Sequence, residues 1–428
     1  MNLIKVKVVV ILSSLSFLCQ SQTNLHFAKI NDFYSLINAE IFEQKLFTFN
    51  AGKFKFTSLI VETENKSDAE IKIFYKSKIG IETYVTSKID YNENVDISTY
   101  CSKLNVFEEE QSIVKIDFGN FKGKVKIILL YAPKTEIELK NKFYKFSNPC
   151  NKPPMISYTE WRKGLPNPKP PRVKTKIEHL VIHHSAGSNN DTDYLNTIRN
   201  IYLLHTQSNG WDDIGYNFLI APDGTIFNGR DPLGAGDDDD ILGAHFCSKN
   251  QNTMGICLMG NFMTKKPDYR AIYSLKYLLA WKLKKDKLDA FGQTKHPQPD
   301  GNMLDNICGH RNGCSTSCPG DSLYLILNNI KFESARIADS CGLKLDFIEP
   351  KIVSFVSVFP NPATDKIYFV LKTEKVVILK VLKSNGSLVL HEKIYTEKPL
   401  EINLEKGIYF YQLISENKII EKSKFMIF

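Results

Sequence analysis

The 428-residue sequence lacks a hydrophobic run long enough to cross a bilayer as a helix. Its most apolar stretch, Val8 to Leu18, is short, follows a basic head (Met1 to Lys7) and ends in polar residues. This arrangement is typical of a secretory signal peptide, which we place at residues 1–21. We therefore expect an exported protein without a transmembrane segment.

The sequence also lacks a strong excess of charge of one sign. The formal net charge is +8, and 24% of the residues are charged. A mild positive charge spread over this length gives no reason to expect a nucleic-acid partner. No internal repeat and no long low-complexity segment is present, and the length suggests a multidomain chain. We expect a monomer.

Cysteines are few, and export decides how they are interpreted, because disulfides persist outside the cytosol. Eight of the nine cysteines remain once the signal peptide, with Cys19, is removed. By region, Cys101–Cys150 and Cys308–Cys314 are possible disulfides, although connectivity does not follow from sequence. Cys247 and Cys257 can be buried thiols or a disulfide.

Residues 23–150 contain many short runs of alternating apolar and polar residues separated by turns, which predict an antiparallel β-sandwich. No cluster of histidine, cysteine and carboxylate residues stands out in this segment. We interpret it as a non-catalytic module, of a wall- or carbohydrate-binding kind. Residues 151–176 are rich in proline and predict a linker or an extended lead-in without a regular helix.

From about residue 177 the pattern mixes strands with helices, which predicts an α/β domain with a single sheet over residues 177–341. The expected elements are a buried strand at 177–182 that ends at His183-His184, helices at 194–205, 269–283 and 321–338, a hairpin of 216–221 with 225–228, and a strand at 253–259. Asp321 is expected to cap the third helix. Residues 352–428 predict a small β-sandwich.

One loop carries metal-ligand chemistry. His310 and Cys318 lie eight residues apart in a polar segment, Cys308 to Gly320, and their side chains are of types that zinc prefers. The nearest third ligand is His183 or His184. Neighbouring strand residues face opposite sides, so only one of the two can face a metal, and the pattern does not decide which. The alternative is a loop of structural disulfides with His310 at the surface.

Several motifs stand in a fixed order along this domain. They are Val181-Ile182-His183-His184-Ser185, Gly210-Trp211-Asp212-Asp213-Ile214-Gly215-Tyr216-Asn217-Phe218, Asp223-Gly224-Thr225, Gly229-Arg230, Gly243-Ala244-His245, Asn252-Thr253-Met254-Gly255-Ile256, Gly260-Asn261-Phe262, Gly309-His310-Arg311 and Thr316-Ser317-Cys318-Pro319-Gly320. In these motifs the chain resembles the zinc-dependent amidase family that includes peptidoglycan recognition proteins and phage lysozyme-type amidases. The resemblance covers the region from Tyr158 to the helix after Gly320.

The resemblance implies a Zn²⁺ cofactor held by His183, His310 and Cys318, with Tyr216 and Thr316 as catalytic neighbours. In part of the family the position of Thr316 is a lysine. Because recognition proteins without hydrolytic activity commonly lack the matching cysteine, Cys318 favours an active enzyme. One departure is that no cysteine occurs between residues 185 and 200, where the recognition branch often carries a pair.

The implied reaction is hydrolysis of the amide between N-acetylmuramic acid and L-alanine, with peptidoglycan or muropeptides as partners. Water activated by zinc would attack, and Tyr216 would donate a hydrogen bond to the developing oxyanion. We expect His205, Trp211, Arg230 and His245 to contact substrate. The absence of a His-Glu-x-x-His motif argues against a metalloprotease helix. The competing hypotheses are a surface protein that binds peptidoglycan without cutting it and an adhesin with a vestigial amidase fold.

The tail carries motifs of its own. Val358-Phe359-Pro360-Asn361-Pro362-Ala363, Ser384-Asn385-Gly386, Lys406-Gly407-Ile408-Tyr409 and the terminus Lys422 to Phe428 follow one another. They resemble the C-terminal sorting domain of the type IX secretion system of Bacteroidota. The resemblance implies handling by the type IX secretion machinery, transport across the outer membrane, and then release or surface attachment.

Overall fold

The computed structural model describes residues 25–42, 46–91, 99–135, 150–169, 173–230, 240–296, 301–343, 356–359, 361–364, 366–371, 376–395, 400–415 and 418–427. The expected signal peptide at residues 1–21 lies outside these residues. Two compact units are present, residues 1–343 and residues 344–428. No helix in the described part of the chain has the length and apolar character needed to span a membrane.

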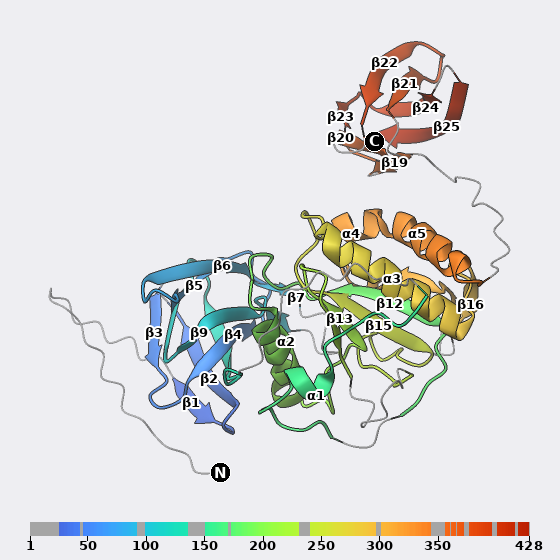
Figure 1. Ribbon diagram of the computed structural model, residues 1–428. Helices are drawn as coiled ribbons and strands as arrows, with labels where there is room; N and C mark the ends of the chain where they lie inside the picture. The colour runs from blue at the N-terminus through green and yellow to red at the C-terminus, as the bar shows by residue number, and fades with distance from the viewer. Residues whose placement is uncertain are drawn as a thin grey trace. The chain divides into compact units, whose positions relative to one another are not determined.

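The first unit begins with two antiparallel sheets that pack face to face, as the alternating pattern predicts (Figure 1). In β3, for example, buried and exposed residues alternate, so one face of the strand enters the core between the sheets. The larger sheet contains β1 (His26–Lys29), β2 (Tyr34–Ile41), β11 (Gly123–Leu130), β4 (Phe56–Thr63), β8 (Tyr100–Cys101), β7 (Asp90–Tyr91) and β9 (Asn105–Gln111). The smaller contains β3 (Leu46–Asn50), β10 (Ile113–Asp117), β5 (Glu70–Lys76) and β6 (Glu82–Lys88).

The second part of this unit is built on one five-stranded sheet with the order β14-β13-β15-β12-β18. The strands are β12 (His179–His184), β13 (Phe218–Ile220), β14 (Ile226–Asn228), β15 (Thr253–Leu258) and β18 (Ile307–Gly309). Strands β13, β15, β12 and β18 run parallel, and β14 closes the predicted hairpin antiparallel to β13. Every residue of β12 and β15 is buried, which explains their continuous apolar runs. The expected α/β domain with a single main sheet is therefore confirmed.

Helices cover both faces of this sheet (Figure 1). On one face lie α3 (Tyr269–Asp286), α4 (Asp321–Leu325) and α5 (Leu327–Ser340); on the other lie α1 (Tyr158–Trp161) and α2 (Tyr194–Leu203), which a π-helical turn (Leu204–Ser208) extends. A short hairpin, β16 (Gln293–Lys295) with β17 (Met303–Asp305), and a 3₁₀ turn (His310–Asn312) complete the set. The predicted third helix is split in two, and Gly320 rather than Asp321 occupies its N-cap position.

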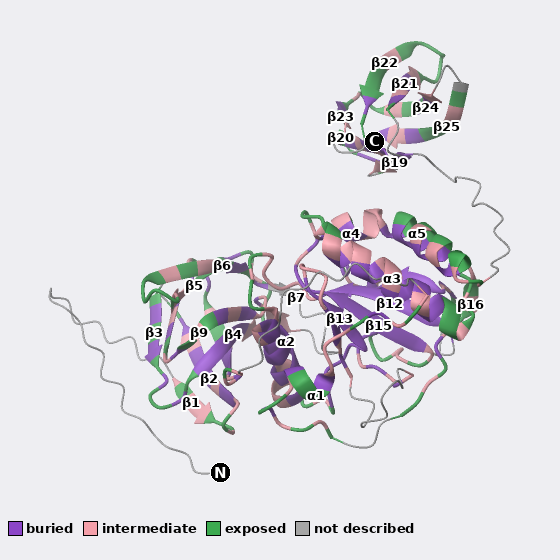
Figure 2. Ribbon diagram, in the orientation of Figure 1, coloured by how far each residue is buried: buried purple, intermediate pink, exposed green. Residues whose placement is uncertain are grey.

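The β-sandwich and the α/β part share a hydrophobic core, which the sequence did not predict. Ile60, Ile128 and Leu130 of the sandwich belong to the same buried cluster as Tyr202 of α2 and Trp161 of α1. Figure 2 shows α2 buried along most of its length. The described residues of the sandwich are thus packed against the α/β part and do not form a separate compact unit.

The proline-rich segment is also packed and does not behave as a free linker. Ser157 begins α1 with a capping box, so the segment does hold a short helix. The indole nitrogen of Trp161 donates to the carbonyl of Asn228 at 2.7 Å. A disulfide joins Cys150 at the start of this lead-in to Cys341 after α5. The expectation that this segment holds no regular helix is therefore wrong.

The second unit is a β-sandwich, as expected for the tail. One sheet contains β19 (Val356–Phe359), β20 (Lys366–Leu371) and β23 (Leu400–Asn403); the other contains β22 (Leu388–Ile394), β21 (Val377–Lys383), β24 (Gly407–Ser415) and β25 (Lys418–Ile427). All strand pairs are antiparallel. Phe369 contacts both Tyr411 and Phe425 in the core between the sheets.

Candidate metal centre

The candidate site lies at the carboxyl ends of neighbouring parallel strands. His183 is at the end of β12, and β18 on one side of it leads directly into His310. Parallel strands present their carboxyl ends at one edge of a sheet, so side chains 127 residues apart in the chain meet there. Cys318 follows on the loop after His310, and a cis peptide bond joins it to Pro319.

His183, His310 and Cys318 come together as three potential metal ligands. One donor atom from each lies within 4.8 Å of the others, and all three side chains are buried. The Sγ atom of Cys318 is 3.7 Å from Nδ1 of His183, and the two imidazole rings have centroids 4.4 Å apart. Two imidazoles and one thiolate, set this close, fit a tetrahedral zinc site with one position left over.

The strand alternation resolves the choice between the paired histidines. His183 faces Cys318, whereas Nδ1 of His184 accepts a hydrogen bond from the backbone N–H of Phe262 at 3.3 Å on the other face of the sheet. The backbone N–H of His184 donates to Sγ of Cys318 at 3.4 Å. Such a hydrogen bond favours the thiolate form, which is the form that binds metal. His184 therefore supports the site through its backbone.

His245 is the immediate neighbour of His183. Its Nδ1 lies 3.0 Å from Nε2 of His183, and its Nε2 lies 3.3 Å from Oγ1 of Thr253. A Cβ atom at position 255 would come within 2.5 Å of the His245 ring, so only glycine leaves room for the imidazole there. With Nε2 of His183 engaged by His245, Nδ1 is the nitrogen left to face Cys318. The expected contact of His245 with substrate remains a prediction.

A row of ring side chains in contact with one another extends from His183. The Tyr216 ring lies 5.3 Å from the His183 ring and 5.7 Å from the His205 ring, and His205 in turn lies 4.6 Å from the Trp211 ring. Nδ1 of His205 accepts a hydrogen bond from the backbone N–H of Gly215 at 3.1 Å, which fixes the turn before Tyr216. Tyr216 and His205 are buried, and Trp211 is half-buried.

The two remaining predicted site residues lie at the margin of this cluster. Oγ1 of Thr316 accepts a hydrogen bond from the backbone N–H of Cys318 at 3.0 Å, so Thr316 shapes the metal loop. The backbone N–H of Arg230 donates to the carbonyl of Tyr216 at 2.8 Å. The positive charge of Arg230 contributes to lowering the pKa of His205 and of His245. All nine residues predicted for the site are thus within one cluster, although their individual roles remain predictions.

Burial keeps three histidines of the site, His183, His205 and His245, neutral. It lowers the pKa of His183 well below the ordinary value, and the neighbouring His310, His245 and His184 lower it further. Burial likewise lowers the pKa of His245 to about 3, with His310 and Arg230 acting in the same direction. The pKa of His205 falls to about 3 for the same main reason. A neutral imidazole is the form that binds metal, so protons do not compete for these nitrogens near pH 7.

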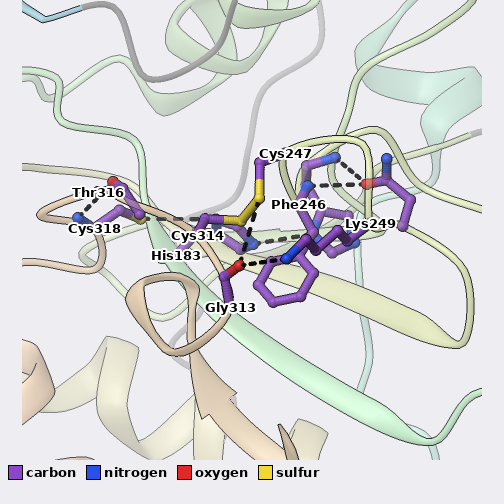
Figure 3. Close-up of a disulfide and its surroundings, with 10 residues drawn as sticks. His183, Phe246, Cys247, Lys249, Gly313, Cys314, Thr316 and Cys318 are labelled. Carbon is purple, nitrogen blue, oxygen red and sulfur yellow. Dashed lines mark hydrogen bonds between the residues drawn. A yellow bond between two sulfur atoms is a disulfide. The ribbon is translucent and has the colours of Figure 1, made fainter. Parts of the chain in front are cut away.

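The disulfides differ from those expected. Cys314 pairs with Cys247, not with Cys308, and Cys150 pairs with Cys341, not with Cys101. Cys308 is a buried thiol in β18, where burial raises its pKa to about 12. Figure 3 shows the Cys247–Cys314 disulfide beside His183 and Cys318. It joins the loop after His245 to the metal loop, so it braces the site from outside the ligand set.

Comparisons with known proteins identify relatives of the α/β part. Residues 173–321 match the family model described as N-acetylmuramoyl-L-alanine amidase. Peptidoglycan-recognition protein SC2 of Drosophila simulans is 30% identical over 174 residues, which cover 40% of this chain and 82% of that protein. Peptidoglycan recognition protein 1 of Mus musculus is 31% identical over 177 residues, which cover 41% of this chain and 86% of that protein.

The chain belongs to the family of peptidoglycan-recognition proteins and N-acetylmuramoyl-L-alanine amidases. Residues 357–427 also match a secretion system C-terminal sorting domain, so the predicted type IX sorting tail is confirmed as a family match. Among solved structures, Drosophila PGRP-LB is 28% identical and aligns over 41% of this chain and 92% of its own, with a TM-score of 0.33. The amidase LysCS from Clostridium intestinale is 23% identical and aligns over 43% and 97%, with a TM-score of 0.33.

Some supporting residues of this family member were not identified from the sequence. Phe246 contacts the His310 ring at a centroid distance of 5.7 Å, and the Asn250 side chain accepts from the backbone N–H groups of His245 and Phe246. Both lie in the loop that carries Cys247. The sequence signal was the motif Gly243-Ala244-His245 followed closely by a cysteine, but its partner, Cys314, is 67 residues away.

Proposed function

We propose that the chain is a secreted, zinc-dependent N-acetylmuramoyl-L-alanine amidase that hydrolyses the amide between N-acetylmuramic acid and L-alanine in peptidoglycan. The observation that carries the proposal is the convergence of His183, His310 and Cys318 within 4.8 Å of one another, with Tyr216 beside them. Family membership supports peptidoglycan as the ligand.

The donor set fits zinc by its chemistry. A zinc ion in such a site supplies Lewis acidity toward an amide carbonyl and toward water. His183 and His310 would hold it as neutral imidazoles and Cys318 as a thiolate, so the ligands would leave part of the ion's charge uncompensated. Nδ1 of His245 contacts Nε2 of His183 and so holds the His183 ring in orientation. The backbone N–H of His184 orients the side chain of Cys318.

The proposed roles of the neighbours follow from their positions. Tyr216 donates its phenolic hydrogen bond to the oxygen of the scissile amide as negative charge develops there. Thr316 would be a weaker donor. His205, Trp211, Arg230 and His245 form the wall against which muropeptide would lie. The C-terminal sorting domain supports export by the type IX machinery, to the medium or to the cell surface.

The test uses the whole exported chain, because the β-sandwich and the α/β part share a core and cannot be assumed to fold apart. The protein is incubated with muropeptides, with and without a chelator, and the products are analysed by mass spectrometry. We expect free stem peptides that disappear on chelation and reappear when zinc is restored. Binding of muropeptides without release would favour the competing function, a recognition protein that does not cut.

Two variants separate chemistry from binding. Cys318→Ala removes a ligand and should abolish both zinc binding and hydrolysis. Tyr216→Phe keeps the ligand set and should retain zinc while slowing hydrolysis by about 100- to 1,000-fold, the usual cost of losing one oxyanion donor. A Tyr216→Phe protein that cleaves at the unaltered rate would remove Tyr216 from the mechanism.

A further inference from the structure

The Cys247–Cys314 disulfide lies against one of the proposed metal ligands. The sulfur atoms of Cys247 and Cys314 and a ring nitrogen of His310 all lie within 4.8 Å of one another. His310 also belongs to the set formed with His183 and Cys318. One histidine is therefore shared between two groups of potential ligands, of which only one is available while the disulfide is closed.

The oxidation state of the two sulfurs decides whether the second group can bind metal. A disulfide sulfur is not a thiolate, and the thiolate is the form that coordinates a metal. As thiols, Cys247 and Cys314 would form with His310 a set of two sulfurs and one nitrogen, which is a normal zinc ligand set. It would carry one thiolate more than the set with Cys318, and would therefore favour soft metal ions more strongly.

We propose that the Cys247–Cys314 disulfide is a redox switch on the metal centre. When it is closed, it braces the loop that carries His310 and Cys318, and the metal binds to His183, His310 and Cys318. When it is reduced, Cys247, Cys314 and His310 form a second set that competes for His310. The switch requires only these side chains, so it does not depend on whether the centre hydrolyses peptidoglycan.

The reducing step is a thiol–disulfide exchange with a dithiol reductant. A thiolate of the reductant attacks Sγ of Cys247, the Cys247–Cys314 bond breaks, and Cys314 leaves as a thiolate. The second thiol of the reductant then attacks the mixed disulfide, so Cys247 is released and the reductant becomes a disulfide. Two electrons pass to the protein, and metal binding displaces the protons of the two new thiols.

The site is accessible to such a reductant. Cys247 is exposed and Cys314 is half-buried, whereas Cys318 is buried. A cavity of about 220 Å³ is lined by Cys314, Gly313 and Phe246 among others. Attack at Cys247 therefore does not require the metal ligands to be uncovered.

The loop around Cys247 also has a backbone that can relax once the bond opens. Cys247 and Ser248 have φ values of 38° and 64°, in the left-handed region that non-glycine residues rarely occupy. Two such residues in sequence cost conformational energy that the surrounding contacts must offset. One of those contacts is the disulfide, so reduction frees Cys247 to turn toward a metal.

The test uses the whole chain with cobalt(II) as the probe, because thiolate ligands give cobalt an intense ultraviolet charge-transfer absorption. The decisive variant is Cys318→Ser, which removes the only thiolate of the first set. Oxidised, it should bind cobalt weakly and without charge transfer. A phosphine reduces the disulfide to two thiols and takes up an oxygen atom from water. After this reduction the variant should bind cobalt tightly, with a charge-transfer absorption whose intensity corresponds to two thiolate ligands. An absorption that stays absent overturns the proposal.

Matched variants assign the new absorption. In Cys318→Ser with Cys247→Ser and Cys314→Ser, reduction should have no effect, since the buried thiols elsewhere are the same in both proteins. A signal that persists there overturns the proposal. In the protein that retains Cys318, Cys247 and Cys314, reduction should double the thiolate charge-transfer absorption, while the stoichiometry stays at one cobalt ion per chain. Two cobalt ions per chain would show that the sets do not compete for His310, which would overturn the switch.

The second disulfide is controlled in the same way. A phosphine also opens Cys150–Cys341, so the Cys150→Ser, Cys341→Ser protein carries Cys247–Cys314 alone among the disulfides of the described residues. It should retain the full response to reduction. A response lost in this protein would assign the effect to the other disulfide and overturn the switch.

Discussion

Arg199 is the residue whose replacement tests most directly whether the β-sandwich and the α/β part form one folding unit. It lies in α2, is almost fully buried, and donates to three backbone carbonyls: those of Trp161 at 2.7 Å, Lys163 at 2.9 Å and Pro133 at 2.8 Å. Two of these carbonyls belong to the lead-in and one to the segment that follows the last strand of the sandwich. Arg199 therefore joins three parts of the chain.

The size of the effect follows from those three bonds. Replacement by methionine keeps most of the side-chain length but leaves three carbonyls without their charged donor. At a net value of about 1–1.5 kcal/mol for each hydrogen bond, Arg199→Met should lower the free energy of unfolding by about 3–4.5 kcal/mol. The desolvation of the guanidinium offsets part of the stabilisation by these hydrogen bonds. Burial lowers the pKa of Arg199 to about 10, so the guanidinium remains charged at neutral pH. The net sign stays destabilising.

The assay is urea unfolding followed by two probes. The three tryptophans, Trp161, Trp211 and Trp281, all lie outside the sandwich, so their fluorescence reports on the α/β part, while hydrogen exchange reports on residues 25–135. Both probes should shift together to lower urea in Arg199→Met. The control is Arg270→Met, which breaks a half-exposed ion pair with Asp268 and should cost no more than about 0.5 kcal/mol. Separate transitions, or equal losses in both variants, would refute the shared unit.

Three further predictions concern other parts of the first unit. His245→Asn should weaken zinc binding by about 10- to 100-fold in competition with a chromophoric chelator, because His245 orients the His183 ring. Burial raises the pKa of Asp191 to about 6, so the native state holds this proton more tightly than the unfolded state, and stability falls as pH rises from about 4 to 6. Asp191→Asn should remove that fall and stabilise the protein at pH 7 but not at pH 4 in urea unfolding. Replacing Cys150 and Cys341 by serine frees a loop of 191 residues and should cost up to about 5 kcal/mol in thermal or urea unfolding.

Each of these predictions has a matched comparison. Thr253→Val removes the outer hydrogen bond to His245, together with the bond that Oγ1 of Thr253 donates to the carbonyl of Asn250, and should weaken zinc binding less than His245→Asn does. Asp193→Asn keeps an equally good N-cap on α2 and should stabilise the protein at pH 7 by less than Asp191→Asn does. Equal effects of Asp191→Asn at pH 4 and pH 7 would contradict the buried carboxyl, and an unchanged unfolding free energy without Cys150 and Cys341 would contradict the role of that disulfide.

The sequence carried enough local information to predict the elements and the chemistry of the site. Continuous apolar runs identified β12 and β15, alternation identified both sandwiches, and the ligand types at His310 and Cys318 pointed to zinc. Alternation along β12 also required that His183 and His184 face opposite sides. These signals are local, because they depend on the periodicity of a strand or on the chemistry of a single side chain.

What the sequence could not supply was which distant surfaces meet. The pairing of Cys314 with Cys247 depends on the parallel order β15-β12-β18, which brings the loop after His245 beside the metal loop. Proximity along the chain favoured Cys308 as the partner of Cys314, but Cys308 lies within β18 and is buried in the core. Proline content favoured a linker, but Trp161 within that segment supplied enough apolar surface to hold it against α2.

The same reasoning explains why the β-sandwich was taken for an independent module. Its own core is complete, with Phe56, Phe107 and Phe118 fully buried, so its sequence satisfies every local requirement of a free domain. Only the second face of its larger sheet indicates the contact with the α/β part. In β11, Ile128 and Leu130 alternate with the residues of the inner core and are also fully buried. A strand that is apolar on both faces must be covered on both, and here α2 provides the cover. The position of α2, and through His205 the position of Tyr216, therefore depends on the packing of the sandwich.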